Sequence, residues 1–137
     1  MKIIHQEIFT IYYENTDSSG FTYHTSYLSF AERARSNMLK QFFPDVMNML
    51  IENKFFFVVR KLNVSFLRPS HLFDNLEITT YFNSNTYTSV DLVQKIKKED
   101  LFICDILVTL VWINGKTLRP SRVPYNIISR FKSLKVV

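Results

Sequence analysis

The chain has 137 residues, the usual length of one domain, and its 47% hydrophobic and 21% charged residues predict a buried core rather than disorder. The longest apolar run, residues 101–113, is interrupted by Asp105 and is too short to cross a bilayer. The first residues lack the apolar stretch and cleavage site of a secretory signal. We therefore expect a soluble, cytoplasmic chain with one domain over residues 1–137 and no stable membrane insertion.

Charge and cysteine content exclude several kinds of site. The 17 basic and 12 acidic residues give a net charge of +5, which suits an anionic partner or simply a solvated basic surface. Like charges form no long block, so we expect no nucleic-acid partner. Cys104 is the single cysteine, which excludes an intramolecular disulfide and a cysteine-based zinc site.

The first half of the chain predicts a strand followed by a helix. Residues Ile4–Tyr13 alternate as a strand, and a helix is predicted over Ser26–Phe42, after a polar loop. Pro44 interrupts this helix, and residues 45–53 predict a second, short one. Leu28 and Leu39 widen an apolar face that is broader than the usual ~100° stripe, so we expect a sheet to wrap the helix. The core of that face contains Tyr27, Phe30, Ala31, Ala34, Met38 and Phe42.

The second half predicts strands joined by short turns. Residues 56–66 and 76–82 alternate, a further strand opens at Val90, and residues 101–113 are apolar on both faces, as in a central strand. Strand, long helix and then several strands indicate an α+β domain, with an antiparallel sheet packed around one helix.

Two features near the C-terminus have specific predictions. Asn114-Gly115 lies between strand formers and predicts a type I′ hairpin turn, which needs a positive φ at both residues. Residues Pro124 to Leu134 predict an amphipathic helix that packs on the sheet through Ile127, Ile128, Phe131 and Leu134.

The loop of residues 13–27 lies between the predicted first strand and the start of the predicted helix, and it contains a candidate catalytic carboxylate. A helix N-terminus presents unpaired N–H groups that suit an oxyanion, and Asp17 in the approaching loop could act as general base or nucleophile. Gly20 permits a positive φ or a close approach to a ligand. A purely structural interpretation is also open, because Asp, Ser and Asn are ordinary turn residues and Thr25 or Ser26 can cap the helix.

The same loop resembles a known enzyme family. The pattern is Tyr13-x-x-Thr16-Asp17-x-x-Gly20-x-x-Tyr23-His24-x-x-Tyr27-Leu28, followed by Phe30-x-Glu32-Arg33-Ala34-Arg35. It is similar to hot-dog-fold acyl-CoA thioesterases of the branch that contains 4-hydroxybenzoyl-CoA thioesterase and the Tol–Pal-associated (YbgC-like) enzymes. The likeness continues through Phe57-Val58-Val59-Arg60-Lys61, Arg68-Pro69-Ser70-x-x-x-Asp74-x-Leu76 and Arg119-Pro120-x-x-x-Pro124, so it covers nearly the whole chain.

This resemblance implies a hot-dog fold that pairs into homodimers, often homotetramers, with the active site between subunits. It places Asp17 at the catalytic carboxylate position and the backbone N–H of His24 at the group that polarises the thioester carbonyl. The side chains of His24 and Tyr13 match positions near that carboxylate. Gly20, Tyr23 and Tyr27 are then expected to bind the substrate, an acyl thioester of coenzyme A or of acyl carrier protein, without metal or cofactor.

Some residues leave alternatives open. Asn15 stands where the family usually has an acid, which motivates a second hypothesis, a non-catalytic acyl-thioester binding module. A dehydratase of the same fold needs a histidine paired with an acid on the helix, and Glu32 has no suitably placed partner. Arg35 on the apolar side predicts a buried or interfacial ion pair. His5 and His71 are expected at the surface or in hydrogen bonds.

Overall fold

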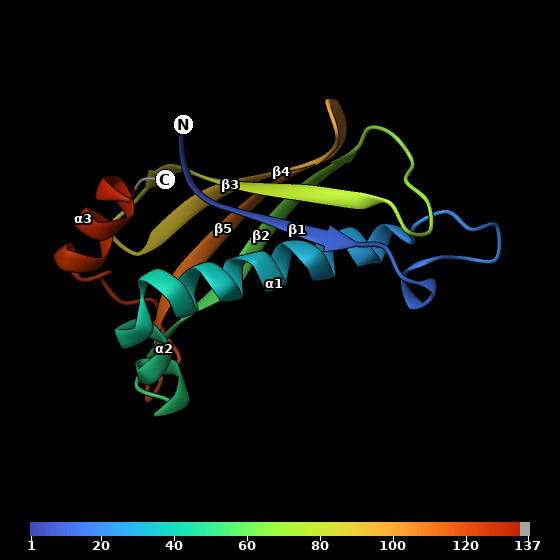
Figure 1. Cartoon of the computed structure of the whole chain (residues 1–137). Coiled ribbons are helices and arrows are strands. Elements are labelled where there is room, and N and C mark those ends of the chain that lie inside the picture. The colour runs from blue at the N-terminus through green and yellow to red at the C-terminus, as the bar shows by residue number, and fades with distance from the viewer. Residues whose placement is uncertain (135–137) are drawn as a thin grey trace.

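In the computed structural model, which describes residues 1–134, a curved antiparallel sheet wraps around one long helix (Figure 1). The order of the strands in the sheet is β1-β3-β4-β5-β2, so β1 and β2 are its two edges. The strands are β1 (Lys2–Thr10), β2 (Phe55–Phe66), β3 (Asn75–Asn85), β4 (Ser89–Lys98) and β5 (Leu101–Asn114). This is the α+β hot-dog architecture that the resemblance implies. Residues 135–137 of the expected domain lie outside the described part of the chain.

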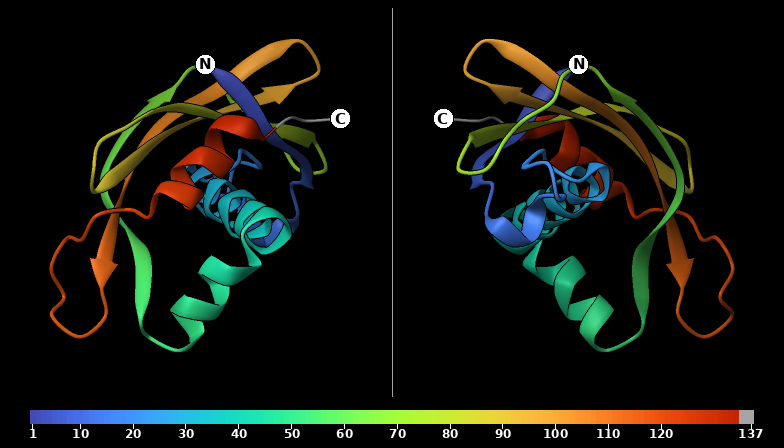
Figure 2. Two further views of the ribbon diagram at one scale, coloured as in Figure 1. Left: turned by 90° about the vertical axis from the view of Figure 1, so that its left-hand side faces the viewer. Right: turned by 90° about the vertical axis from the view of Figure 1, so that its right-hand side faces the viewer.

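The central helix α1 (His24–Phe42) lies inside the curve of the sheet (Figure 2). Its apolar residues recur every three to four positions and therefore face the sheet together. This confirms the predicted wrapped helix, which begins two residues earlier than expected. The buried residues of α1 are Ser26, Tyr27, Phe30, Ala31, Ala34, Arg35 and Met38.

The predicted first strand is too long at its C-terminal end. β1 stops at Thr10, and the chain then forms a 3-10 turn, η1 (Tyr13–Asn15). The side-chain oxygen of Asn15 accepts a hydrogen bond from the Tyr12 N–H at 2.9 Å, which fixes this turn. Tyr13 therefore leaves the sheet and is 82% exposed.

The turn after β5 differs from the predicted type I′ hairpin. β5 lies between β4 and β2, as expected for a central strand. Neither Asn114 nor Gly115 has a positive φ, whereas Leu118 has φ 57°. The Leu118 N–H donates to the Asn114 carbonyl at 2.8 Å, so the turn is wider than a two-residue hairpin turn. A Cβ at Gly115 would lie 2.0 Å from the carbonyl oxygen of Asn53, so this glycine permits a close approach between two loops.

Two shorter helices complete the fold. α2 (Pro44–Ile51) begins at the proline itself, a position that needs no N–H donor. α3 (Tyr125–Ser133) is amphipathic as predicted and buries Ile127, Ile128 and Phe131. The Phe131 ring packs 4.4 Å from the ring of Phe43 and 5.8 Å from that of Phe82 on β3. No helix among residues 1–134 combines the length and hydrophobicity of a membrane span.

Two buried polar side chains differ from the sequence expectation. Arg35 is 8% exposed and donates to the side-chain oxygen of Gln94 at 2.8 Å, so its partner is a neutral amide rather than an acid. Burial lowers the pKa of the Arg35 guanidinium, and the negative charge of Glu32 offsets part of this shift. His5 is 7% exposed, and its Nδ1 has no hydrogen-bond partner among residues 1–134. His71 is exposed, as expected.

Candidate active site

A short hairpin over residues 16–22 carries the predicted catalytic aspartate. Thr16 and Thr22 pair as an antiparallel bridge, and the Asp17 N–H bonds the Phe21 carbonyl at 2.8 Å. The Gly20 N–H closes the turn on the Asp17 carbonyl at 3.1 Å. Gly20 has φ +83°, a conformation that glycine adopts without steric cost. Within residues 1–134, no atom beyond its chain neighbours lies within 4 Å of a Cβ built there. Gly20 therefore sets the backbone of the hairpin.

The carboxylate of Asp17 is held by its own turn. Its Oδ1 accepts hydrogen bonds from the Ser19 N–H, at 2.8 Å, and from the Ser19 hydroxyl. These bonds, that of the hydroxyl first, lower the pKa of Asp17 below its usual value. Asp17 is therefore ionised at neutral pH, as a base or nucleophile must be.

The first turn of α1 lacks a side-chain cap. Tyr23 occupies the N-cap position without a capping hydrogen bond from its side chain, and the first turn holds no acidic residue. The carbonyl of Asn15 accepts from the Tyr23 N–H at 2.8 Å and from the Ser26 hydroxyl at 3.2 Å. Because α1 begins at His24, Thr25 and Ser26 lie within the helix, and neither caps it. The amides at this end of α1 retain the capacity to bind an oxyanion.

A cavity of about 270 Å³ opens beside the start of α1. The Phe66 ring lies 5.9 Å from the ring of His24 and 6.1 Å from that of Tyr27, centroid to centroid. Arg68 brings a positive charge to the rim and also donates to the carbonyl of Phe102 at 2.9 Å. The residues that line this cavity are Thr22, His24, Tyr27, Phe66, Leu67, Arg68 and Pro69.

A buried hydroxyl network joins the hairpin, the helix and the segment after β2. The Ser70 hydroxyl, 0% exposed, lies 2.7 Å from the hydroxyl of Thr22 and 2.7 Å from that of Tyr27. The Thr22 N–H also bonds the Ser70 carbonyl at 2.9 Å. Sequence reasoning assigned Ser70 no role in the site, although the Arg68-Pro69-Ser70 motif was a signal. The network fixes one wall of the cavity.

The structure brings together only some of the predicted site residues. His24 and Tyr27 line the cavity, and Asp17 and Gly20 lie in the adjoining hairpin. Tyr23 and Tyr13 are 49% and 82% exposed, and neither is among the lining residues. Among residues 1–134, no group of three or more His, Cys, Asp or Glu side chains is arranged to hold a metal ion.

Relatives of the chain share one description. The family model of the thioesterase-like superfamily matches residues 13–131. The Escherichia coli protein described as acyl-CoA thioester hydrolase YbgC is 36% identical over 123 residues, which cover 89% of this chain and 91% of that protein. The Haemophilus influenzae acyl-CoA thioesterase YbgC is 27% identical over 125 residues, with 91% and 92% covered.

Solved structures show the same fold. A probable thioesterase from Bartonella henselae is 29% identical, with a TM-score of 0.78 over 88% of this chain and 99% of that one. Slr0204 of Synechocystis, a 1,4-dihydroxy-2-naphthoyl-CoA thioesterase, has a TM-score of 0.86 at 15% identity over 95% of this chain and 96% of its own. With the family match and the hot-dog topology, these likenesses show that the chain belongs to the thioesterase-like superfamily and is a thioester hydrolase of its YbgC-like branch.

Proposed function

We propose that this hydrolase acts on acyl-CoA thioesters, with Asp17 as the catalytic carboxylate and the backbone N–H of His24 as the donor to the thioester carbonyl. The observation that carries the proposal is the uncapped start of α1 beside a cavity, with an ionised carboxylate in the adjoining hairpin. The relatives described as acyl-CoA thioester hydrolases support the choice of substrate.

Thioester hydrolysis needs only Asp17, the backbone N–H of His24 and a water molecule. The thioester carbonyl oxygen accepts a hydrogen bond from the helix amide, which stabilises the negative charge that develops there. Asp17 either attacks the carbonyl carbon, forming a mixed anhydride that a water molecule then hydrolyses to the free acid, or removes a proton from a water that attacks the carbonyl carbon directly. In both routes the C–S bond breaks and sulfur leaves as a thiolate. Removing one oxyanion donor typically costs ~10²–10³ in rate, so a donor on a rigid helix is effective.

The proposal includes a second copy of the chain. β2 is an edge strand whose Val59 and Leu62 are 44% and 42% exposed, so its free edge can pair with β2 of another protomer. Asp17 does not line the cavity of its own protomer, and a partner across β2 would complete the site. We therefore propose a homodimer, or a homotetramer built from it, in which each subunit contributes one hot-dog domain over residues 1–137.

Asn15 has a structural role, so its presence is not by itself a reason to prefer a passive binding module. Its side chain holds the turn before the hairpin, and its carbonyl fixes the start of α1. The side-chain amide performs the first task without a charge, and the second is done by the backbone carbonyl, which any residue supplies. The chemistry assigned to Asp17 does not require an acid at position 15.

The test is a thiol-release assay on a panel of acyl-CoA and acyl carrier protein thioesters. We expect turnover by the wild-type chain and a loss of ~10²–10⁴-fold in kcat for Asp17→Asn, with ligand binding retained. Asp100→Asn, in the β4–β5 turn, is the matched control and should keep full activity. Equal kcat values for Asp17→Asn and wild type would remove Asp17 from the mechanism. No turnover of any thioester would favour the binding module.

The assay has little background from the protein itself. Cys104 is fully buried, and burial raises the pKa of its thiol to about 12. A thiol reagent added to the folded chain therefore reports the released carrier thiol.

A further inference from the structure

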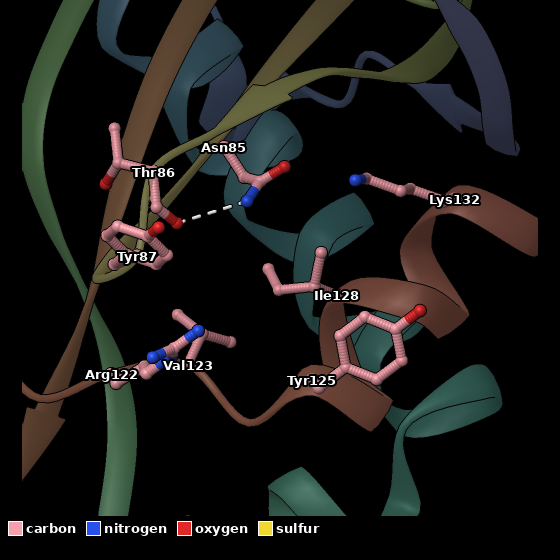
Figure 3. Close-up of a pocket in the computed structure, with 8 residues that line it drawn as sticks. All are labelled: Asn85, Thr86, Tyr87, Arg122, Val123, Tyr125, Ile128 and Lys132. Atoms are coloured by element: carbon pink, nitrogen blue, oxygen red, sulfur yellow. Dashed lines mark hydrogen bonds between the residues drawn. The ribbon is translucent and has the colours of Figure 1, made fainter.

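A second cavity lies at the opposite end of the molecule from the hairpin of residues 16–22. It has a volume of about 260 Å³ and lies between the β3–β4 turn and α3 (Figure 3). In Figure 1, α3 and the hairpin mark the two ends of the molecule. We call it the α3 cavity; its lining residues are Asn85, Thr86, Tyr87, Arg122, Val123, Tyr125, Ile128 and Lys132.

The lining combines an apolar floor with exposed aromatic rings. Val123 and Ile128 are 3% and 8% exposed and form the floor. Tyr87 and Tyr125 are 74% and 84% exposed and stand on opposite sides of the cavity, with Ile128 between them (Figure 3). Neither tyrosine is needed to fill the core. Exposed aromatic faces of this kind are platforms on which planar rings stack.

Among residues 1–134, two cations and no acids line the same cavity. The guanidinium of Arg122 lies 4.6 Å from the centre of the Tyr87 ring, and the ammonium of Lys132 points inward from α3 (Figure 3). Arginine and lysine are the usual partners of phosphate groups. Because Arg122 covers one face of Tyr87, a planar ring of a ligand would stack on Tyr125, and phosphates of the same ligand would contact the two cations.

The walls of the α3 cavity are held together before any ligand binds. The Val123 N–H donates to the Tyr87 carbonyl at 2.8 Å and so ties the loop before α3 to the β3–β4 turn. The side-chain amide of Asn85 donates to the Thr86 carbonyl at 3.1 Å within that turn. A site fixed in this way loses little entropy on binding.

We propose that the α3 cavity binds a nucleotide, with the base against Tyr125 and the phosphates on Arg122 and Lys132. Its volume lies just below the ~300–1,000 Å³ of typical ligand sites, which suits a nucleoside phosphate rather than a whole acyl thioester. The nucleotide is either the end of a coenzyme A bound at another protomer's catalytic site, a case that rests on the proposed function, or a free nucleotide.

The test measures equilibrium binding of adenosine 3′,5′-bisphosphate, the nucleotide end of coenzyme A, by calorimetry on the full chain. We expect saturable binding that weakens roughly ten-fold or more in Tyr125→Ser, because the stacking partner of the base is lost. Arg122→Gln should weaken it similarly and reduce its salt dependence. Lys116→Gln, an exposed lysine in the turn after β5, carries the same charge change outside the cavity and should bind like wild type. No binding, or equal affinities in all variants, would overturn the site.

Two further measurements distinguish the nucleotide end of coenzyme A from a free nucleotide. If the nucleotide belongs to coenzyme A, the bisphosphate competes with acyl-CoA, and Tyr125→Ser raises KM without lowering kcat. If AMP or ATP binds with the same dependence on Tyr125 while KM for acyl-CoA is unchanged, the ligand is a free nucleotide. Asp17→Asn should bind the bisphosphate normally in both cases. Absence of turnover in the wild-type chain would therefore contradict the proposed function and leave the binding result intact.

Discussion

The chain contains two glycines, and a side chain would be unfavourable at each for a different reason. At Gly20 the obstacle is the backbone, which has φ +83° in open space. At Gly115 it is a neighbour, because a Cβ would lie 2.0 Å from the carbonyl oxygen of Asn53. Sequence reasoning assigned a positive φ to Gly115 and left Gly20 open. The contact with Asn53 joins segments far apart in the sequence, so no local pattern reveals it.

The two glycines allow a comparison of stability by substitution. Gly20→Ala should reduce the free energy of unfolding by about 1–2 kcal/mol, the cost of a left-handed alanine. Gly115→Ala should cost about 3 kcal/mol, because the backbone of residues 53–54 must move. Urea unfolding of both variants measures the difference. A smaller loss for Gly115→Ala than for Gly20→Ala would contradict the close contact.

Ser19 should control the pH dependence of catalysis. Its hydroxyl is the main reason that the pKa of Asp17 is lowered. If the ionised carboxylate is the base or nucleophile, activity falls as the pH drops through this pKa. Ser19→Ala removes the hydroxyl bond, so the pKa rises toward its usual value and the acid limb of kcat/KM moves to higher pH. Ser18→Ala serves as the control. An unchanged acid limb in Ser19→Ala would separate Asp17 from that ionisation.

At the scale of secondary-structure elements, a polar bridge ties α1 to the sheet. The Gln94 side chain on β4 accepts from Arg35 at 2.8 Å and donates to the Ala31 carbonyl at 2.9 Å. A third bond, at 3.1 Å, goes to the hydroxyl of Thr80. Gln94 is 0% exposed, so water cannot replace these bonds.

Gln94→Ala should therefore be strongly destabilising. It leaves the buried guanidinium of Arg35 without its acceptor and removes the side-chain donor to the Ala31 carbonyl, at a cost of about 3 kcal/mol in the free energy of unfolding. Gln41→Ala, at an exposed position of α1, should change it by less than about 0.5 kcal/mol. Chemical denaturation of the two variants measures both values. A loss below about 1 kcal/mol for Gln94→Ala would show that the bridge contributes little.

Helices and strands with a clear pattern of apolar residues could be predicted from the sequence. The residues at which they end were harder to predict. α1 and β5 carry continuous apolar patterns, and the structure confirms both. β1 ends early because Asn15 pairs with the backbone of Tyr12, a contact that strand alternation does not encode. The residues of the candidate site could be predicted only in part from the sequence, for the same reason. The residue pattern indicated Asp17 and His24, whereas Ser70 enters through contacts between distant segments.

At the scale of the whole molecule, the two edge strands have different expected roles. β2 is the edge proposed to pair with a second copy, and β1 is the opposite edge. Leu62→Asp on β2 should convert the dimer to a monomer, because pairing would bury an uncompensated charge. Since the proposed site lies between protomers, kcat/KM should fall with the dimer.

Ile8→Asp on β1 is the matched control. Ile8 is 65% exposed, so the substitution places the same charge on the other edge of the sheet. Light scattering after size-exclusion chromatography gives the mass of each variant. Dimers in both variants would exclude β2 as the interface, and monomers in Ile8→Asp alone would assign the contact to β1.

The exposed aliphatic edge of β2 also affects how thermal data on this chain must be interpreted. If protomers unfold as they separate, mass action favours the folded state as the total protein concentration rises. The melting temperature should then fall as the protein is diluted. A single thermal midpoint quoted without the protein concentration would have no thermodynamic meaning.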